Sequence, residues 1–291
     1  MTSTITLLGA SGTIGKATAQ ALRSAGYAVR TPDRAAFADL APHMSGADAV
    51  ISCLASRTGT PKDAWHVDHA LNSAALTAAQ DAGVGQFVLL SAICVQKPKL
   101  AFQQAKLAFE AELQSSGLTY SIIRPTAFFK SLSGQIDRVR AGKPFLVFGD
   151  GTLTACKPIS DRDLGSYLVR ALDDPAMQGR ILPIGGPGPA ITPLDQAAML
   201  SEALGQDVPI KHVPPRLLTT IATGLGLIGL RTKSQLARIG HYYATESMLV
   251  WDGTRYDADA TPEFGQDTLA DHYRALVRGQ ITDDRGAHAV F

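Results

Sequence analysis

The hydrophobic pattern at the start of the chain changes its period twice in quick succession. Thr4–Leu8 is a short, β-favouring apolar run, and after a glycine-rich loop Lys16–Ser24 is alanine-rich and favours a helix. Tyr27–Thr31 then resumes as a strand. This order predicts a strand–helix–strand unit in which a crossover helix joins two parallel strands.

Two later runs are almost continuously apolar, which is typical of strands that are covered on both faces of a parallel sheet. They are Ala49–Leu54 and Gln86–Ser91, and Thr119–Arg124 is a further predicted strand, halted by Pro125. Alanine-rich composition or helical spacing predicts helices over Val67–Ala82 and Leu100–Gln114. Strands that alternate with helices predict an α/β fold with a Rossmann-like, doubly wound parallel sheet.

The connection after the second strand is short. Pro32–Ala47 has 16 residues, fewer than a complete extra strand and crossover helix would need. We therefore expect the region from the second to the fourth strand to be trimmed. A reduced strand is expected around Ala35–Phe37, with a missing or rudimentary helix before it.

Glycine and proline become frequent beyond Pro125, as in Gly185–Pro189. Such segments predict the loops of a smaller region packed at the carboxyl ends of the strands, where open α/β sheets bind ligands. We expect residues 1–155 to form the nucleotide-binding domain and residues 156–291 to form mainly a substrate-binding region. Later segments such as 181–187 are expected to return to the sheet.

Composition excludes several classes of protein. Lys plus Arg number 27 against 26 Asp plus Glu, so the formal charge is +1, and only 18% of residues are charged. The chain therefore lacks the basic excess that binding of phosphate backbones by bulk charge requires, and no nucleic-acid partner is expected. With 45% hydrophobic residues the chain can bury a large core, which excludes global disorder.

Cysteine usage and the first residues bear on location. Three cysteines without a Cys-x-x-Cys pair fit a reducing compartment, and the first residues lack the basic and long apolar regions of a signal peptide, so a cytoplasmic location is expected. Leu217–Leu230 spans 14 positions with three glycines, shorter than the ~20 residues that a bilayer crossing needs, and favours a buried helix. Arg216, Arg231 and Lys233 at its ends would also suit a helix lying against a membrane or a greasy ligand.

The loop between the first strand and the first helix carries the pattern Gly9-x-x-Gly12-x-x-Gly15. Glycines there allow a tight turn and the close approach of a pyrophosphate, whose charge is met by backbone N–H groups and the helix dipole. The alternative is a glycine turn without a ligand, which the order of strand, loop, helix and strand disfavours. We expect dinucleotide contacts from Gly9, Ser11, Gly12, Thr13, Ile14 and Gly15.

The residues after the second strand select between NAD and NADP. An acidic side chain there binds the ribose 2'-hydroxyl, whereas an arginine pairs with a 2'-phosphate. Arg34, helped by Arg30, favours NADPH, while Asp33 keeps NAD open. All three also fit a solvated surface turn.

A lysine interrupts an apolar stripe of the second predicted helix. Phe102, Lys106, Phe109 and Leu113 fall on that stripe at spacings of four, three and four. A buried lysine needs hydrogen-bond partners, such as a cofactor ribose and a strand-end oxygen. The structural alternative is an ion pair with Glu110, four residues further on. We favour a site role for Lys106 because the stripe points inward.

Polar residues elsewhere add two expectations. Ser91 ends a buried strand and so projects into the crevice, where it could donate a hydrogen bond to substrate or nicotinamide, or simply cap the strand. Among the histidines, only His66 and His69 are close enough in sequence to share a helix face, and no acidic or cysteine partner completes a zinc set with them. No metal site in the protein itself is expected.

The nucleotide loop, the strand-end serine and the lysine helix together resemble the short-chain dehydrogenase/reductase superfamily, in its atypical branch with NmrA-like and isoflavone-reductase-like members. Longer strings are more specific, because they are similar to the NADPH-dependent divinyl chlorophyllide a 8-vinyl reductases of chlorophyll and bacteriochlorophyll synthesis. These strings cover most of the chain and are Ser52–Gly59, Phe87–Pro98, Arg124–Leu132, Cys156–Ser160, Ile181–Gly188 and Asp257–Pro262.

This resemblance implies reduction of the 8-vinyl group of divinyl chlorophyllide a, or of divinyl protochlorophyllide, to ethyl by hydride from NADPH. The partner would be a magnesium-tetrapyrrole substrate, and the location would be cytoplasmic or peripheral to the photosynthetic membrane. Typical members of the superfamily carry Tyr-x-x-x-Lys, whereas here Phe102 stands at the tyrosine position and Lys106 remains. Loss of the phenol suits the resemblance, because a vinyl reductase has no carbonyl oxygen to protonate.

The resemblance also implies roles for individual residues. Lys106 and Ser91 would be the catalytic pair, with Lys106 holding the nicotinamide ribose and with water or Lys106 as the proton source. Further cofactor contacts are expected from Leu54, Ala55, Pro125 and Thr126, and substrate contacts from Arg57, Phe128, Phe129 and Lys130. For Phe128 and Phe129, ordinary packing in the core is an equal alternative.

Two other functions stay open. One is another NADPH-dependent reductase of a conjugated alkene or quinone on the same scaffold. The other is a non-catalytic, NmrA-like NADP-binding regulator or assembly subunit. The missing tyrosine keeps the regulator in consideration, and the long shared strings count against it.

Overall fold

The computed structural model describes residues 2–282, and the chain divides into two compact units. The first unit comprises the residues up to Pro125 together with Asp161–Ile184, and the second comprises Thr126–Ser160 and the residues from Gly185 onward. The first segment of the first unit ends at Pro125, whereas the sequence analysis expected the nucleotide-binding domain to extend to residue 155. Its second segment, Asp161–Ile184, includes part of the expected return to the sheet over 181–187.

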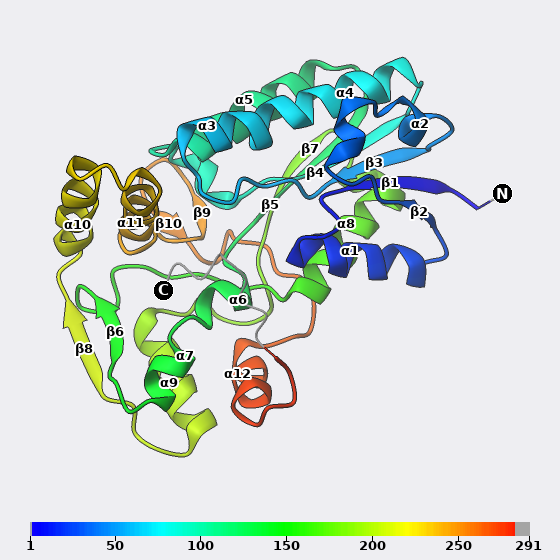
Figure 1. Ribbon diagram of the computed structural model, residues 1–291. Helices are drawn as coiled ribbons and strands as arrows, with labels where there is room; N and C mark the ends of the chain where they lie inside the picture. The colour runs from blue at the N-terminus through cyan, green and yellow to red at the C-terminus, as the bar shows by residue number, and fades with distance from the viewer. Residues whose placement is uncertain (1, 283–291) are drawn as a thin grey trace. The chain divides into compact units, whose positions relative to one another are not determined.

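A six-stranded parallel sheet with strand order β2-β1-β3-β4-β5-β7 forms the centre of the first unit (Figure 1). The chain passes from β1 to β2, its neighbour on one side, and then crosses back to β3, its neighbour on the other side. Such a reversal, at the carboxyl ends of β1 and β3, is where open α/β sheets bind ligands. The strands are β1 (Thr4–Leu8), β2 (Ala28–Arg30), β3 (Ala49–Ser52), β4 (Gln86–Leu90), β5 (Thr119–Pro125) and β7 (Arg180–Ile184).

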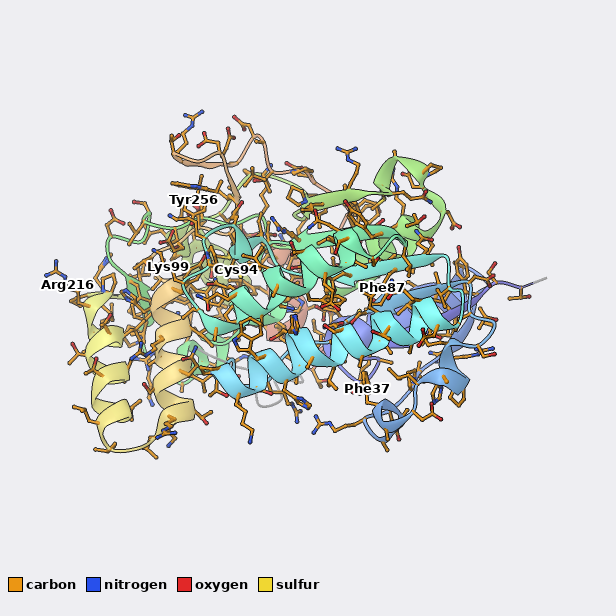
Figure 2. All side chains as sticks on the ribbon, turned by 90° about the horizontal axis from the view of Figure 1, so that it is seen from above. Phe37, Phe87, Cys94, Lys99, Arg216 and Tyr256 are labelled. Atoms are coloured by element: carbon orange, nitrogen blue, oxygen red, sulfur yellow. The ribbon has the colours of Figure 1, made fainter. Side chains whose placement is uncertain are left out.

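Helices cover both faces of this sheet. In Figure 1, α4 and α5 lie over one face, and α1 and α8 lie over the other. Figure 2 shows α4 and α5 side by side, and the Phe87 ring of β4 packs edge-on against Phe109 of α5 at a centroid distance of 5.9 Å. The helices are α1 (Thr13–Ser24), α3 (Pro61–Ala64), a π-helical turn (Trp65–Ala70), α4 (Leu71–Asp81), α5 (Ala101–Ser115) and α8 (Asp161–Asp173).

The short link between β2 and β3 contains no strand. Ala35–Ala38 is a 3₁₀ helix and α2 (Ala41–Met44) is a single helical turn, so the strand predicted around Ala35–Phe37 is wrong. The physical reason is local capping, because the Asp33 carboxylate accepts the Ala36 amide at 3.0 Å and closes a helical turn. The region is trimmed as expected, but its short helical turns lie at and after Ala35–Phe37, whereas a missing or rudimentary helix was expected before these residues.

The second unit contains two small sheets and several helices. β6 (Phe145–Phe148) pairs in parallel with β8 (Ile210–Val213), and β9 (Val250–Trp251) pairs antiparallel with β10 (Tyr256–Asp257). Its core includes Tyr273, which is fully buried and donates its hydroxyl to the Leu132 carbonyl at 2.7 Å. Its helices are α6 (Phe129–Leu132), α7 (Ile136–Arg140), α9 (Pro193–Leu204), α10 (Arg216–Leu227), α11 (Arg231–Tyr243) and α12 (Leu269–Val277).

The apolar stretch Leu217–Leu230 forms α10 and the turn after it, and it is not the buried helix that its composition predicts. Ala222 is its one buried residue, whereas Leu227 and Ile228 are 85% and 69% exposed. The reason is that α10 packs mainly on α11 along one stripe, and most of its other side stays exposed among the described residues. Within residues 2–282, no helix combines the length and apolar character that crossing a membrane requires.

Two helical glycines provide a test of this packing. A Cβ at Gly165 of α8 would lie 2.8 Å from the Ala17 carbonyl carbon of α1, whereas a Cβ at Gly224 of α10 would meet nothing within 4 Å. We expect Gly165→Ala to lower the free energy of unfolding by ~1–3 kcal/mol, because backbone must move. Gly224→Ala should raise it by up to ~1 kcal/mol through helix propensity. Urea titration of both variants measures this, and equal effects would contradict the α1–α8 contact.

Candidate functional site

The loop between β1 and α1 is shaped for an anionic ligand. Gly9 has a φ of 75°, and a Cβ there would lie 2.8 Å from the Cys53 carbonyl oxygen. A Cβ at Gly15 would lie 2.1 Å from the Gly9 carbonyl oxygen. Gly12 is the N-cap of α1 and has no side chain to cap it, and the first turn carries no acidic residue. The positive end of the helix dipole therefore faces a backbone cradle, which fits a dinucleotide pyrophosphate.

The other predicted loop residues occupy different depths. Ser11 is exposed at the loop, Thr13 is half-buried at the start of α1, and Ile14 is buried beneath it. Leu54 follows β3 and lies beside Gly9, since its amide nitrogen would be 3.1 Å from a Cβ at that glycine. The loops that follow β1 and β3 therefore meet at the switch point, and Ala55 continues the second loop as an exposed residue.

Cys53 lies next to the glycine loop, and its thiol is not reactive. Burial raises the pKa of its thiol to about 12, although the Thr18 hydroxyl lies 3.8 Å from the sulfur. The thiol is therefore protonated at neutral pH and behaves as a small apolar side chain.

The three residues predicted to select the cofactor have different surroundings. Arg30 donates through Nη1 to the carbonyl oxygens of Ser45 at 2.5 Å and His43 at 3.3 Å, which ties down the link before β3. Asp33 caps the 3₁₀ helix. Arg34 is exposed, and its side chain makes no hydrogen bond or ion pair with the rest of residues 2–282. Arg34 is therefore the side chain that is freest to meet a 2'-phosphate.

Lys106 is 8% exposed and pairs with a buried acid that the sequence analysis did not single out. Its Nζ lies 3.1 Å from Oδ1 of Asp68, which is 1% exposed and belongs to the π-helical turn before α4. The predicted alternative partner, Glu110, binds elsewhere. An ammonium has three protons, so Lys106 keeps two for a ligand.

A chain of hydrogen bonds anchors Asp68 to the sheet. Oγ of Ser52, the last residue of β3, donates to Oδ1 of Asn72 at 2.6 Å, and Nδ2 of Asn72 donates to the Asp68 backbone carbonyl at 3.1 Å. The Ser56 amide donates to Oδ1 of Asp68 at 3.2 Å. Oδ2 of Asp68 is buried and has no hydrogen-bond partner within the described part of the chain. A buried carboxylate oxygen of this kind is a further acceptor for a hydroxyl-bearing ligand.

A second buried acid organises the end of β4. Glu110 is 1% exposed, and its Oε1 accepts from Nε of Arg124 at 3.1 Å while Nη2 of that arginine binds Oε2. The Ser91 hydroxyl donates to Oε1 of the same carboxylate. With its proton directed to Glu110, Ser91 offers its oxygen as an acceptor to any further group. Its predicted role as donor to substrate or nicotinamide stays a prediction.

The loop after β3 is held in place by acids. Asp63 accepts the amide and the hydroxyl of Thr58, each at 2.7 Å. Burial alone would raise the pKa of Asp63, but these hydrogen bonds outweigh it and lower that pKa. Arg57 lies exposed in this loop. An ordered loop with an exposed cation suits the predicted contact to a carboxylate, which stays a prediction.

The remaining predicted residues lie where β5 passes into the second unit. Pro125 ends β5 and is buried, and the Thr126 hydroxyl donates to the Lys157 carbonyl. Phe129 is 4% exposed, with its ring 5.3 Å from that of His272, so core packing accounts for it. Phe128 is half-buried at the start of α6.

Lys130 of α6 is half-buried, and its substrate contact stays a prediction. The histidines considered for metal lie on the π-helical turn. The His69 ring is tilted against that of Trp65 at a centroid distance of 5.4 Å, and its Nε2 lies 3.5 Å from Oε2 of Glu112, while His66 is exposed. No group of three or more His, Cys, Asp or Glu side chains that could hold a metal occurs within residues 2–282.

Comparison with known proteins identifies the relatives of this chain. A family described as NAD(P)H-binding matches residues 9–175. The divinyl chlorophyllide a 8-vinyl-reductase of Zea mays is 44% identical over 274 residues, which cover 90% of this chain and 68% of the relative. The chain belongs to this 8-vinyl-reductase family. The Cucumis sativus member is 46% identical over 84% of this chain and 61% of the relative, so the chain spans roughly two thirds of the length of these chloroplastic 8-vinyl-reductases.

The chain is also similar, at lower identity, to proteins outside the 8-vinyl-reductase family. The photosystem II assembly factor Ycf39 of Trieres chinensis is 25% identical over 76% of this chain and 75% of the relative. An NADPH-dependent quinone oxidoreductase of Escherichia coli superposes with a TM-score of 0.66 at 18% identity, covering 94% of this chain and 99% of the other. Leucoanthocyanidin reductase of Vitis vinifera gives 0.69 at 16% identity, over 95% and 100%. These structures confirm the Rossmann-like fold.

Asp68, Asn72 and the real partners of Glu110 are the site features that the sequence analysis missed. A signal for the first two was present, because Asp68 and Asn72 fall four residues apart on a stripe that continues with Ala75 and Ala79. Polar residues on an otherwise apolar helical stripe indicate a buried network in the same way that Lys106 does.

The buried acid at the end of β4 gives a stability prediction. Glu110→Ala leaves the Arg124 guanidinium without its anion, and we expect the free energy of unfolding to fall by ~3 kcal/mol. Glu112→Ala is the matched control, since Glu112 is 39% exposed on the same helix and its loss should cost under ~1 kcal/mol. Chemical denaturation measures both. Equal losses would contradict the assignment of Glu110 to the buried network.

Proposed function

We propose that this chain reduces the 8-vinyl group of divinyl chlorophyllide a, or of divinyl protochlorophyllide, to an ethyl group, with NADPH as the hydride source. The observation that carries the proposal is the 44% identity to the Zea mays 8-vinyl-reductase over 90% of this chain. The glycine cradle, the Lys106–Asp68 pair and the Ser91–Glu110–Arg124 network, which would serve this reaction, all lie in the first unit.

Different residues are proposed to bind three parts of NADPH: the pyrophosphate, the 2'-phosphate and the nicotinamide ribose. Gly9, Gly12 and Gly15 receive the pyrophosphate, because only a backbone without Cβ atoms leaves room for it. Arg34 pairs with the 2'-phosphate. Lys106 donates to the hydroxyls of the nicotinamide ribose, and the buried Oδ2 of Asp68 accepts from the same group. Bound NADPH supplies the hydride for the vinyl group.

Asp68 is a positioning residue in this proposal. Its carboxylate fixes the direction of the Lys106 ammonium and balances its charge inside the protein, where an unpaired cation would be costly. The anchor through Asn72 to Ser52 in turn fixes Asp68. The reaction also needs a proton for the inner vinyl carbon, and the donor is Lys106 or a water molecule.

Substrate contacts are assigned by chemistry. Arg57 or Lys130 would receive the propionate carboxylate of a magnesium tetrapyrrole, and Phe128 would offer an apolar wall to its flat ring. Phe129 is the weaker candidate, because it is already packed against His272.

Incubation of the purified chain with divinyl chlorophyllide a and NADPH tests the proposal. We expect loss of NADPH with appearance of the monovinyl product, which is followed by its absorption shift and its chromatographic mobility. Lys106→Ala should lower kcat at least ~100-fold while the variant still folds. No conversion together with intact NADPH binding would instead favour a regulator, the reading to which the 25% identity to the Ycf39 assembly factor points.

Cofactor choice is tested at one exposed residue. Arg34→Ala removes the proposed partner of the 2'-phosphate, so we expect the affinity for NADPH to fall at least ~10-fold while that for NADH stays within ~2-fold. Arg23→Ala is a control because Arg23 is an exposed cation in the last turn of α1, away from the glycine loop. Calorimetry with both cofactors measures the effect, and equal losses for the two would overturn the assignment of Arg34.

A further inference from the structure

The helical hairpin of α10 and α11, residues 216–243, exposes more apolar surface than its neighbours. Leu217 and Ile221 are four residues apart on one side of α10, and they are 48% and 41% exposed. Leu227, Ile228 and Leu230 form the tip between the helices and are 85%, 69% and 42% exposed. Several large apolar side chains gathered at one exposed tip mark a contact surface.

The two helices themselves are firmly packed together. The inner side of α10 buries Ala222, whose carbonyl accepts the Ser234 hydroxyl of α11 at 2.7 Å. His241 of α11 lies with Nδ1 3.1 Å from the carbonyl oxygen of Pro215, the N-cap of α10. The two helices therefore hold each other at two places, and the exposed apolar side of α10 is not the side that packs on α11.

The charged residues of the hairpin segment all have the same sign. Lys211, Arg216, Arg231, Lys233 and Arg238 occur between residues 208 and 245, and this stretch contains no Asp or Glu. The chain as a whole is nearly neutral, with a formal charge of +1. Figure 2 shows Arg216 at the start of α10, the end away from the turn into α11, with its side chain pointing away from the ribbon. Such local excess attracts an anionic surface.

We propose that the tip of the α10–α11 hairpin docks on an anionic lipid surface. Leu227, Ile228 and Leu230 would enter the boundary between head groups and acyl chains, while Arg231 and Lys233, which directly follow them, meet the lipid phosphates. Binding at the interface requires this pairing of apolar and basic side chains and requires no membrane span. The proposal does not depend on the reaction proposed above.

A partner protein or a second copy of this chain is the competing occupant. A second copy would bring the same basic residues against one another, and Arg231 and Lys233 beside the tip would repel their counterparts. Anionic lipid matches both features of the hairpin at once, its exposed apolar side chains and its uniform positive charge.

Flotation with lipid vesicles tests the proposal on the full chain. We expect binding to vesicles of phosphatidylcholine mixed with phosphatidylglycerol and at least ~10-fold weaker binding to phosphatidylcholine alone, with further loss at high salt. Leu227→Ser with Ile228→Ser, and separately Arg231→Gln with Lys233→Gln, should each weaken binding at least ~10-fold.

Matched controls are available in the same unit. Leu153→Ser removes an apolar side chain that is 51% exposed elsewhere, and Arg255→Gln removes a cation whose side chain is 76% exposed, and both should bind vesicles like the parent chain. Thermal unfolding checks that all variants fold. Absence of binding to anionic vesicles, or equal losses in the control variants, would overturn the proposal. Self-association that the tip variant abolishes, without vesicle binding, would assign the surface to a second copy instead.

Discussion

Two almost completely buried carboxylates, Asp68 and Glu110, position Lys106, Arg124 and Ser91 at the carboxyl ends of β3 and β4. Each must find a cation, because an unpaired charge in the interior costs several kcal/mol. Two cations are within reach, and they are divided between the acids: Lys106 pairs with Asp68, and Arg124 pairs with Glu110. The division frees Lys106 from the acid one turn away on its own helix.

This division gives the site its chemical character. Arginine binds Glu110 through two nitrogens in a fixed geometry, which suits a structural pair that also holds Ser91. Lysine pairs with Asp68 through one atom and keeps two protons, which suits a group that must also hold a ligand. Phe102, four residues before Lys106 on α5, adds no polar group, so Lys106 and Asp68 are the charged pair that remains available to a ligand in the first unit's proposed site.

Local sequence patterns predicted most of the parallel sheet and the glycine loop, because apolar runs and glycine spacing are read within a few residues. The strand expected around Ala35–Phe37 failed because Asp33 caps a helical turn, a competition that composition does not reveal. The pairing of Lys106 with Asp68 was not predicted from the sequence for another reason. Asp68 is 38 residues earlier in the chain, and only the packing of the π-helical turn on α5 brings the two together. The prediction that Leu217–Leu230 forms a buried helix was wrong because apolar composition favours burial but does not show which part of the protein would cover the helix.

The coupling between Lys106 and Asp68 tests this account most directly. NADPH affinity is measured by calorimetry for Lys106→Met, Asp68→Asn and the double variant, and in parallel for Lys106→Met combined with Glu110→Gln. The account predicts that the first pair couples by ~1.5 kcal/mol or more, whereas the second pair is additive within ~0.5 kcal/mol. Additive losses for Lys106 and Asp68, with coupling between Lys106 and Glu110, would contradict it.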